Sequence, residues 1–236
     1  MVSERAGRDK NCALFDIWRV AMRVVLLAGG GHASDVLGVI EARNAYISED
    51  SGRRIEVVGI LDDNEIDPKR FSHRGIAQIG RISDVNKVDA GHFISCAGFP
   101  KGRKYLADIG LNAGLRGLTV IHPLAWLPED VVVDEGSVIL AGVCSSPGVK
   151  IGAHAYLSHG SLVGHDTVIG DFSSIMPNVN VCGDATISEG VTLGASSTVL
   201  QGVSIGAWST IGAGALAVKD VPANVVAKGV PAKWDS

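Results

Sequence analysis

The sequence has few charged and few aromatic residues. Of its 236 residues, 19% are charged and 5% are aromatic, and 21 Lys and Arg against 25 Asp and Glu give a net charge of −4. A chain without a basic excess has no broad positive surface for nucleic acid or anionic lipid. We therefore expect neither as a partner.

The four cysteines form neither a metal-binding nor a disulfide pattern. Cys12, Cys96, Cys144 and Cys182 are widely and irregularly spaced along the chain, with no CxxC motif. Zinc ribbons and disulfide scaffolds need closer, regular spacing. Reduced thiols are the simpler interpretation, and we expect a cytoplasmic location.

No segment has the pattern of a membrane span or a secretory signal. Residues 1–21 carry charges throughout and have no apolar core. The longest uncharged stretch, residues 190–218, is rich in Ser, Thr and Gly, whereas a membrane span is mostly large apolar side chains. We expect no membrane span, and we treat residues 1–21 as an N-terminal extension without an indicated role.

Glycine and aliphatic residues are abundant, and in the C-terminal half they recur with a period of six. The chain has 30 glycines and is 46% apolar. Of seventeen positions taken every sixth residue from Ile121, fifteen are Ile, Leu or Val. They are Ile121, Leu127, Val133, Ile139, Ser145, Ile151, Leu157, Val163, Ile169, Ile175, Val181, Ile187, Leu193, Val199, Ile205, Ile211 and Ala217. The positions four residues after these, from Ala125 to Ala215, are all small or β-branched.

A strict period of six fits neither a helix nor an ordinary alternating strand. It fits a triangular prism in which each hexad forms one side and three hexads complete a coil, with the aliphatic residue inside and the small residue near a corner. Glycine often follows the aliphatic residue, as in Ile169-Gly170 and Ile205-Gly206. We expect these glycines to supply the backbone freedom of tight corners.

The N-terminal half predicts a small parallel α/β sheet. Apolar runs at 23–28, 55–61 and 92–97 predict strands, and segments 33–42 and 101–109 predict helices. We therefore expect an α/β domain over 22–117 and a β-helix with a C-terminal tail over 118–236.

Polar and glycine residues follow the first two strands, where ligands gather in such sheets. Gly29, Gly31 and His32 lie in a glycine turn before a helix, which favours an anion such as phosphate. Asp62 and Asp63 end the second strand and could accept hydrogen bonds from a ribose or a base. The alternatives are a turn without a ligand and a helix cap or solvated turn.

The spacing of the histidines in the prism does not predict a metal site. Only residues three hexads apart stack, and His154, His159 and His165 stack on Phe172, Pro177 and Gly183, none of which is a usual metal ligand. We expect no metal.

His165 is the candidate base, with an ordinary surface histidine as the alternative. Asp166 beside it could orient the ring or stabilise its cation. Gly183 lies one coil away, where a bare N–H could face an oxyanion. Asp184 stacks on Asp166, and two close carboxylates resist joint ionisation.

The chain resembles the sialic-acid O-acetyltransferase and bacillosamine-type nucleotide-sugar N-acetyltransferase family of hexapeptide-repeat acyltransferases. The matching motifs, which cover nearly everything beyond residue 21, are the turn at 29–32, Leu61-Asp62-Asp63, Ala97-Gly98 with Arg103, Ile121-His122-Pro123, Gly164-His165-Asp166, the segment 169–173 and the segment 229–233. Relatives often carry Glu at position 166, and some carry a second histidine where this chain has Ser174.

The resemblance implies a left-handed β-helix, a homotrimer and acetyl-CoA as co-substrate. It implies His165 as general base with Asp166, and Gly183 as the group that polarises the thioester. Acetyl-CoA is expected near Gly183, Ala195 and Ala213, and the nucleotide sugar near the 29–32 turn, Asp62, Asp63, Gly98 and Arg103.

The expected activity is therefore direct transfer of acetyl from acetyl-CoA to a nucleotide-linked amino sugar. The alternatives are O-acetylation of a sialic-acid-like sugar and, more distant, a scaffold without enzymatic activity.

Overall fold

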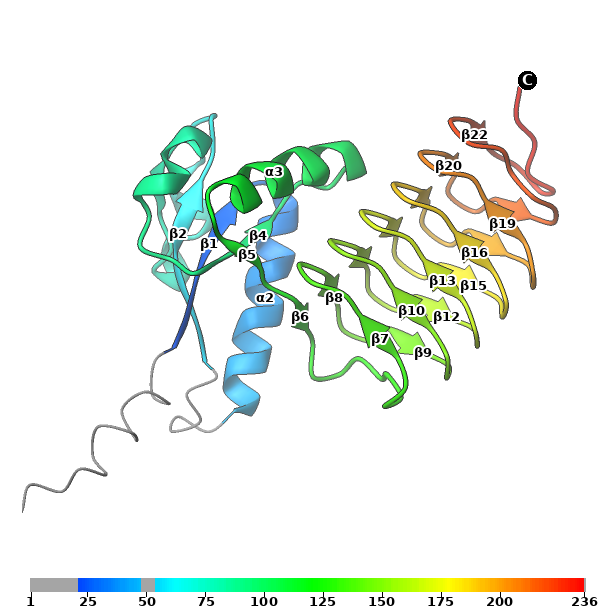
Figure 1. The fold of residues 1–236 in the computed structure, drawn as a ribbon, viewed down its shortest axis with the longest axis horizontal. Helices are drawn as coiled ribbons and strands as arrows, with labels where there is room; N and C mark the ends of the chain where they lie inside the picture. The colour runs from blue at the N-terminus through cyan, green and yellow to red at the C-terminus, as the bar shows by residue number, and fades with distance from the viewer. Residues whose placement is uncertain (1–20, 48–53, 236) are drawn as a thin grey trace, which may run out of the picture.

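The computed structural model describes residues 21–47 and 54–235, so Cys12 and all but the last residue of the predicted extension over 1–21 lie outside the described residues. The chain forms a small α/β unit followed by a long triangular β-helix (Figure 1). This arrangement confirms the predicted fold class.

The N-terminal unit is a five-stranded parallel sheet in the order β3-β2-β1-β4-β5. Its strands are β1 (Met22–Leu27), β2 (Ile55–Leu61), β3 (Gln78–Gly80), β4 (His92–Ser95) and β5 (Arg116–Gly117). Three short 3-10 helices, η2 (Pro68–Arg70), η3 (Ser72–Arg74) and η4 (Ile82–Lys87), lie between β2 and β4. The sequence predicted β1, β2 and β4.

Helices α2 (Gly31–Tyr46) and α3 (Pro100–Asn112) cover opposite faces of this sheet. Val36 and Val39 of α2 pack with Val24 of the sheet and with Leu140 of the β-helix, so α2 is the middle layer between the two units. Leu106 of α3 packs on the other sheet face. In the described part of the chain, no helix has the length and apolarity needed to cross a membrane.

The β-helix has three parallel sheets, here called faces A, B and C. Face A contains β6 (Val120–Ile121), β8 (Val138–Ile139), β11 (Tyr156–Leu157), β14 (Ser174–Ile175), β17 (Thr192–Leu193), β20 (Thr210–Ile211) and β22 (Val226–Ala227). Face B contains β9 (Cys144–Ser145), β12 (Leu162–Val163), β15 (Asn180–Val181), β18 (Thr198–Val199) and β21 (Leu216–Ala217). Face C contains β7 (Val132–Val133), β10 (Lys150–Ile151), β13 (Val168–Ile169), β16 (Thr186–Ile187) and β19 (Ser204–Ile205).

The period of six determines the register of the prism. Each two-residue strand ends on the predicted inward residue and pairs with the strand three hexads along the chain, as Val163 does with Val181. From Ile139 onward these residues are buried in one continuous core. Only the last coil departs from the period, because Ile211 pairs with Ala227 and not with Gly229, the residue that three full hexads would reach.

The predicted reason for the glycines after the aliphatic residues was wrong. The left-handed conformation occurs three residues after the aliphatic one, for example at His154 (φ 54°) and Asp166 (φ 56°). Gly170, directly after Ile169, is needed for space instead, because a Cβ there would lie 2.6 Å from the backbone nitrogen of Glu189 on the next coil. Glycine at this position therefore lets the coils stack closely.

Candidate active site

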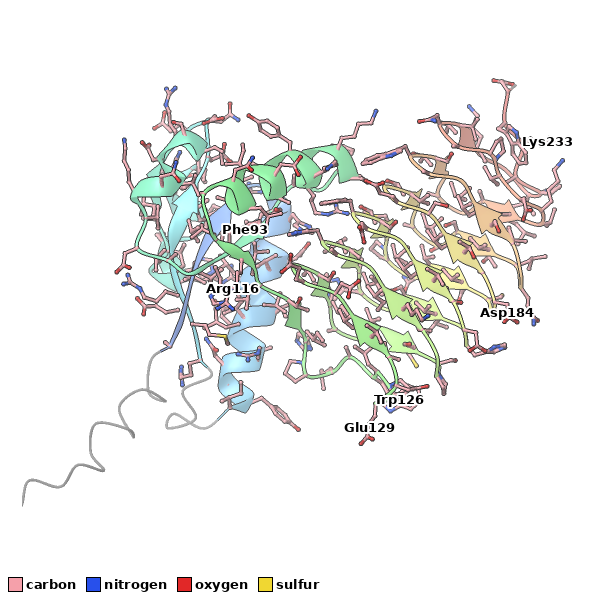
Figure 2. The ribbon with its side chains drawn as sticks, in the orientation of Figure 1. Phe93, Arg116, Trp126, Glu129, Asp184 and Lys233 are labelled. Carbon is pink, nitrogen blue, oxygen red and sulfur yellow. The ribbon has the colours of Figure 1, made fainter. Side chains whose placement is uncertain are left out.

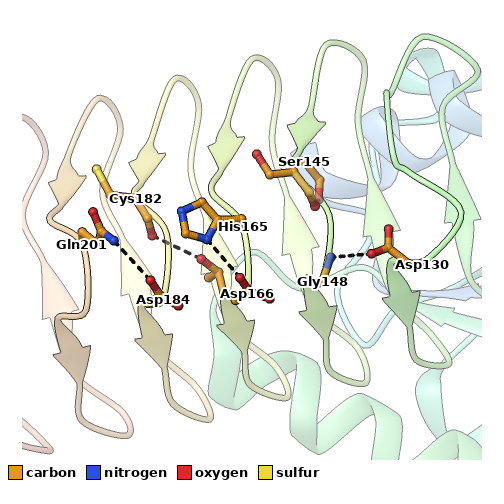
Figure 3. A network of polar contacts seen from close by, with 10 residues as sticks. Asp130, Ser145, Gly148, His165, Asp166, Cys182, Asp184 and Gln201 are labelled. Carbon is orange, nitrogen blue, oxygen red and sulfur yellow. Dashed lines mark hydrogen bonds and ion pairs between the residues drawn. The ribbon is translucent and has the colours of Figure 1, made fainter.

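His165 lies on the edge where face B turns into face C, here called the His165 edge. It extends over His165, Gly183 and Gln201, which occupy the same position on three successive coils. Figure 3 labels His165 and Gln201 on this edge. The side chain of His165 is 54% exposed. Its ring lies against Gly183, since a Cβ on that glycine would be 2.6 Å from Cε1 and 2.8 Å from Cδ2 of the imidazole. The predicted stacking of these two residues is therefore present.

Asp166 is bonded to the imidazole of its neighbour. Nδ1 of His165 lies 3.0 Å from Oδ2 of Asp166. A carboxylate at Nδ1 favours the tautomer with its proton on that nitrogen, and Nε2 is then available as a base. The shorter Asp side chain, in place of the Glu that relatives often carry, therefore still reaches the ring.

Asp184 lies beside this pair and is fixed by Gln201. Nε2 of Gln201 donates to Oδ2 of Asp184 at 3.2 Å, and the backbone nitrogen of Asp184 donates to the carbonyl of His165 at 2.8 Å. Figure 2 shows Asp184 on the outside of the prism. One ligand-type atom from each of His165, Asp166 and Asp184 lies within 4.8 Å of the others. Because exposed acidic clusters are common without a metal, we assign none.

The two alanines predicted to bind acetyl-CoA lie on a different edge. Ala195 and Ala213 stack on each other where face A turns into face B, here called the Ala195 edge, and Gly214 donates to the carbonyl of Ala195 at 2.9 Å. Both alanines are exposed. One chain therefore does not bring them together with Gly183.

The glycine turn after β1 meets the end of β2 through a side chain. Asp62 accepts a hydrogen bond from the backbone nitrogen of Gly29 at 2.7 Å and another from that of Asn64 at 2.9 Å. Both carboxylate oxygens of Asp62 are thus used to shape the turn. Asp63 is exposed and uses one oxygen to accept from the backbone nitrogen of Ile82 at 3.1 Å. Of the two predicted carboxylates, Asp63 is the more accessible to a ligand.

The glycine turn lies at the point where the sheet reverses its strand order. The chain runs from β1 to β2 and β3 on one side and then returns to β4 and β5 on the other. Crevices at such points are the usual ligand sites of open parallel sheets. Exposed Gly30 and Gly31 follow β1, and exposed Gly98 and Phe99 follow β4. The backbone at the N-terminus of α2 is therefore exposed at this end of the sheet.

His32 is the second residue of α2, and its side chain is turned away from solvent. It is 8% exposed, its ring lies edge-on to Tyr156 with centroids 4.2 Å apart, and its Nε2 has no partner among the described residues. Burial, with a smaller contribution from the charge of Arg103, lowers the pKa of His32 to about 3. It is neutral at physiological pH.

Arg103, predicted to bind the nucleotide sugar, instead joins the two structural units. It is 2% exposed, and its guanidinium donates to the carbonyls of His154, Phe172 and Ser173 in the β-helix at 3.1, 2.5 and 3.0 Å. It also donates to the carbonyl of Gly98 at 3.2 Å. The side chain is thus fully engaged by main-chain carbonyls, and we remove it from the proposed binding residues.

Sequence reasoning missed two further contacts across the same junction. The hydroxyl of Tyr156 donates to Oδ2 of Asp35 in α2 at 3.0 Å. His154 stacks between Phe93 and Phe172, with ring centroids 5.7 and 5.3 Å away. Figure 2 labels Phe93 within the N-terminal unit. A large aromatic residue at an outward-facing hexad position, such as Tyr156, is the signal that could have indicated a covered face.

Comparisons with known proteins agree with this fold. Residues 166–201 match the bacterial transferase hexapeptide family (six repeats). The chain therefore has the fold of a left-handed parallel β-helix, and residues 166–201 carry hexapeptide repeats. This hexapeptide-repeat protein is similar in structure to a variant of perosamine N-acetyltransferase from Caulobacter crescentus, crystallised with CoA and GDP-perosamine. The TM-score is 0.81 and the identity 28%, over 90% of this chain and 96% of that one.

Two serine acetyltransferases are similar to the hexapeptide-repeat protein in sequence. That of Synechococcus elongatus is 30% identical over 150 residues, and the mitochondrial serine acetyltransferase 3 of Arabidopsis thaliana is 39% identical over 97 residues. The matches cover 57% and 37% of this chain, and 62% and 25% of these relatives. The chain therefore spans less than two thirds of either one.

Proposed function

We propose that this protein transfers the acetyl group of acetyl-CoA to the amine of a nucleotide-linked amino sugar. The observation that carries the proposal is the exposed His165 ring, which has Asp166 on Nδ1 and the bare Gly183 beneath it. Similarity over 90% of the chain to an enzyme crystallised with CoA and GDP-perosamine supports the substrate class.

The proposed reaction uses His165 first as base and then as acid. Nε2 takes a proton from the sugar amine while the amine nitrogen attacks the thioester carbonyl. The tetrahedral intermediate then collapses, the carbon–sulfur bond breaks, and the leaving thiolate takes the proton back from the imidazolium. General-base catalysis of this kind contributes about 10²- to 10⁴-fold.

Gly183 supplies a donor for the oxyanion. Its N–H donates to none of the described residues and lies on the His165 edge, directly beside the imidazole. A backbone N–H that needs no reorganisation stabilises the negative charge that develops on the carbonyl oxygen. No covalent intermediate on the enzyme is required.

The nucleotide part of the substrate would bind at the carboxyl ends of the strands of the N-terminal sheet, where the strand order reverses. Of the residues predicted to bind it, Gly31, Asp63 and Gly98 are exposed, whereas Gly29 and His32 are buried. The N-terminus of α2 has unpaired N–H groups that suit a phosphate.

The active protein would be a homotrimer. Acetyl-CoA can touch both Gly183 and Ala213 only if the His165 edge of one protomer faces the Ala195 edge of its neighbour, because each chain holds these residues on separate edges. Such a heterologous interface closes into a ring. The cytoplasmic location stays a prediction from the cysteine pattern.

The test is thiol release from acetyl-CoA by wild type and His165→Ala with a panel of acceptors. The panel contains UDP-, GDP- and CMP-linked 4-amino sugars, matched hydroxyl sugars, a sialic acid and L-serine. We expect turnover with an amino sugar, and its loss in the variant by a factor within the general-base range. Turnover only with a hydroxyl acceptor would assign O-acetylation instead, and full activity of His165→Ala would remove this residue from the mechanism.

A further inference from the structure

A second carboxylate shares the surroundings of the proposed base. Asp166 and Asp184 lie one coil apart on the same edge, and both adopt the left-handed conformation, with φ of 56° and 58°. Their side chains therefore leave the prism in the same direction (Figure 3). An oxygen of each, together with a ring nitrogen of His165, forms a group within 4.8 Å.

Asp184 is fixed in place without being neutralised. The uncharged side-chain amide of Gln201 donates a hydrogen bond to Oδ2 of Asp184. The backbone nitrogen of Asp184 donates to the carbonyl of His165. Among the salt bridges of the described residues, neither Asp184 nor Asp166 pairs with a lysine or arginine; Asp166 pairs only with the His165 ring. The negative charge of Asp184 thus remains available to the ring.

We propose that Asp184, held by Gln201, is a positioning residue that stabilises the protonated His165 formed when the acceptor loses its proton. This inference rests on the proposed function. Asp166 sets the tautomer through Nδ1, whereas Asp184 acts on the ring from the next coil. Two close carboxylates repel each other, and a cation beside both relieves that repulsion.

The charged groups near the ring define a matched control. Asp166 faces the ring from its own coil and Asp184 from the next one. Asp130 occupies the same position two coils before Asp166, where it accepts from the backbone nitrogen of Gly148 at 2.9 Å. At about 4.8 Å per coil, Asp130 is roughly 10 Å from Asp166, a distance at which salt largely screens exposed charges.

The experiment compares Asp184→Asn with Asp130→Asn, both isosteric losses of one charge. The acidic limb of kcat/KM against pH is measured with EDTA present, so that no adventitious cation links the carboxylates. For Asp184→Asn we expect the half-maximal point to move to lower pH by about half a unit, with Asp184→Glu restoring it. Asp130→Asn should leave the profile in place. Coincident profiles for wild type and Asp184→Asn would overturn the proposal, as would an equal displacement in both variants.

An NMR titration of the His165 ring gives the same comparison without any substrate. We expect its midpoint to fall in Asp184→Asn and to stay unchanged in Asp130→Asn. If the enzyme assay fails but this difference is found, the proposed function is wrong and the coupling between Asp184 and His165 stands. If turnover is present and neither the profile nor the titration moves, only the role of Asp184 is wrong.

Discussion

The imidazole of His165 occupies the space that a side chain on Gly183 would need. A Cβ there would lie 2.6 Å from Cε1 of the ring, well inside van der Waals contact. Gly183 does not adopt a left-handed conformation, so its own backbone does not require glycine. Glycine is needed here because the neighbouring imidazole takes up the space of a side chain. The position and exposure of the proposed base thus depend on a residue one coil away.

Gly183→Ala is therefore expected to remove activity without unfolding the protein. The methyl group displaces the imidazole, and kcat/KM should fall by about 10²- to 10⁴-fold while the melting temperature changes little. Gly164→Ala is the contrasting variant, because its methyl group would lie 2.7 Å from the backbone carbon of Cys182. That variant should lose roughly 1–3 kcal/mol of stability. Normal turnover by Gly183→Ala would contradict this account.

Arg103→Met is expected to weaken the junction between the two units. The carbonyls of His154 and Phe172 accept from Arg103 alone among the described residues, whereas that of Ser173 also accepts from the backbone nitrogen of Tyr156. The variant therefore leaves two buried carbonyls without a donor, and each unsatisfied group costs about 1–3 kcal/mol. We expect a total loss of about 3 kcal/mol or more in the free energy of unfolding, measured by denaturation at fixed protein concentration. Lys101→Gln, on the exposed side of α3, is the control. If Arg103→Met instead raised KM for a nucleotide sugar at unchanged stability, the original binding assignment would return.

Acid should destabilise the folded protein through His32. Its pKa is about 3 in the folded protein against an ordinary value of 6.5, so the unfolded chain binds the extra proton between these values. Stability from neutral His32 is complete above pH 6.5 and is lost as the pH falls toward 3, by up to about 1.4 kcal/mol per pH unit. His32→Gln should flatten the dependence of stability on pH between 7 and 5. Exposed His73→Gln should leave that slope unchanged, and an equal slope in all three proteins would refute the assignment.

The prism could be predicted almost completely because each hexad has the same local pattern, with one inward-facing aliphatic residue and one corner. The coil of three hexads also places Gly183 beside His165 by arithmetic alone. The short edge strands β3 and β5 were not predicted, since runs as short as Gln78–Gly80 and Arg116–Gly117 carry no periodic signal.

The rest of the candidate site depends on contacts that no local pattern encodes. Arg103 donates to carbonyls 51 to 70 residues away, and carbonyls are present at every position of a chain. The sequence therefore shows that Arg103 follows the glycine at position 98 but does not show which groups its guanidinium contacts. Similarly, His32 is covered in part by the ring of Tyr156, a residue of the other unit.

The proposed trimer makes a prediction about mixtures of two inactive chains. His165→Ala removes the base from one edge, and Ala213→Trp blocks the exposed Ala195 edge with a large side chain. If one site is built from both edges of neighbouring protomers, a ring containing both variants has one site in which both edges are wild type. Doubly tagged rings, purified after co-expression, should then recover roughly one third of the wild-type activity. Each variant alone should be inactive. Activity of Ala213→Trp alone, or no recovery in the mixed rings, would show that the Ala195 edge does not complete the site of a neighbour.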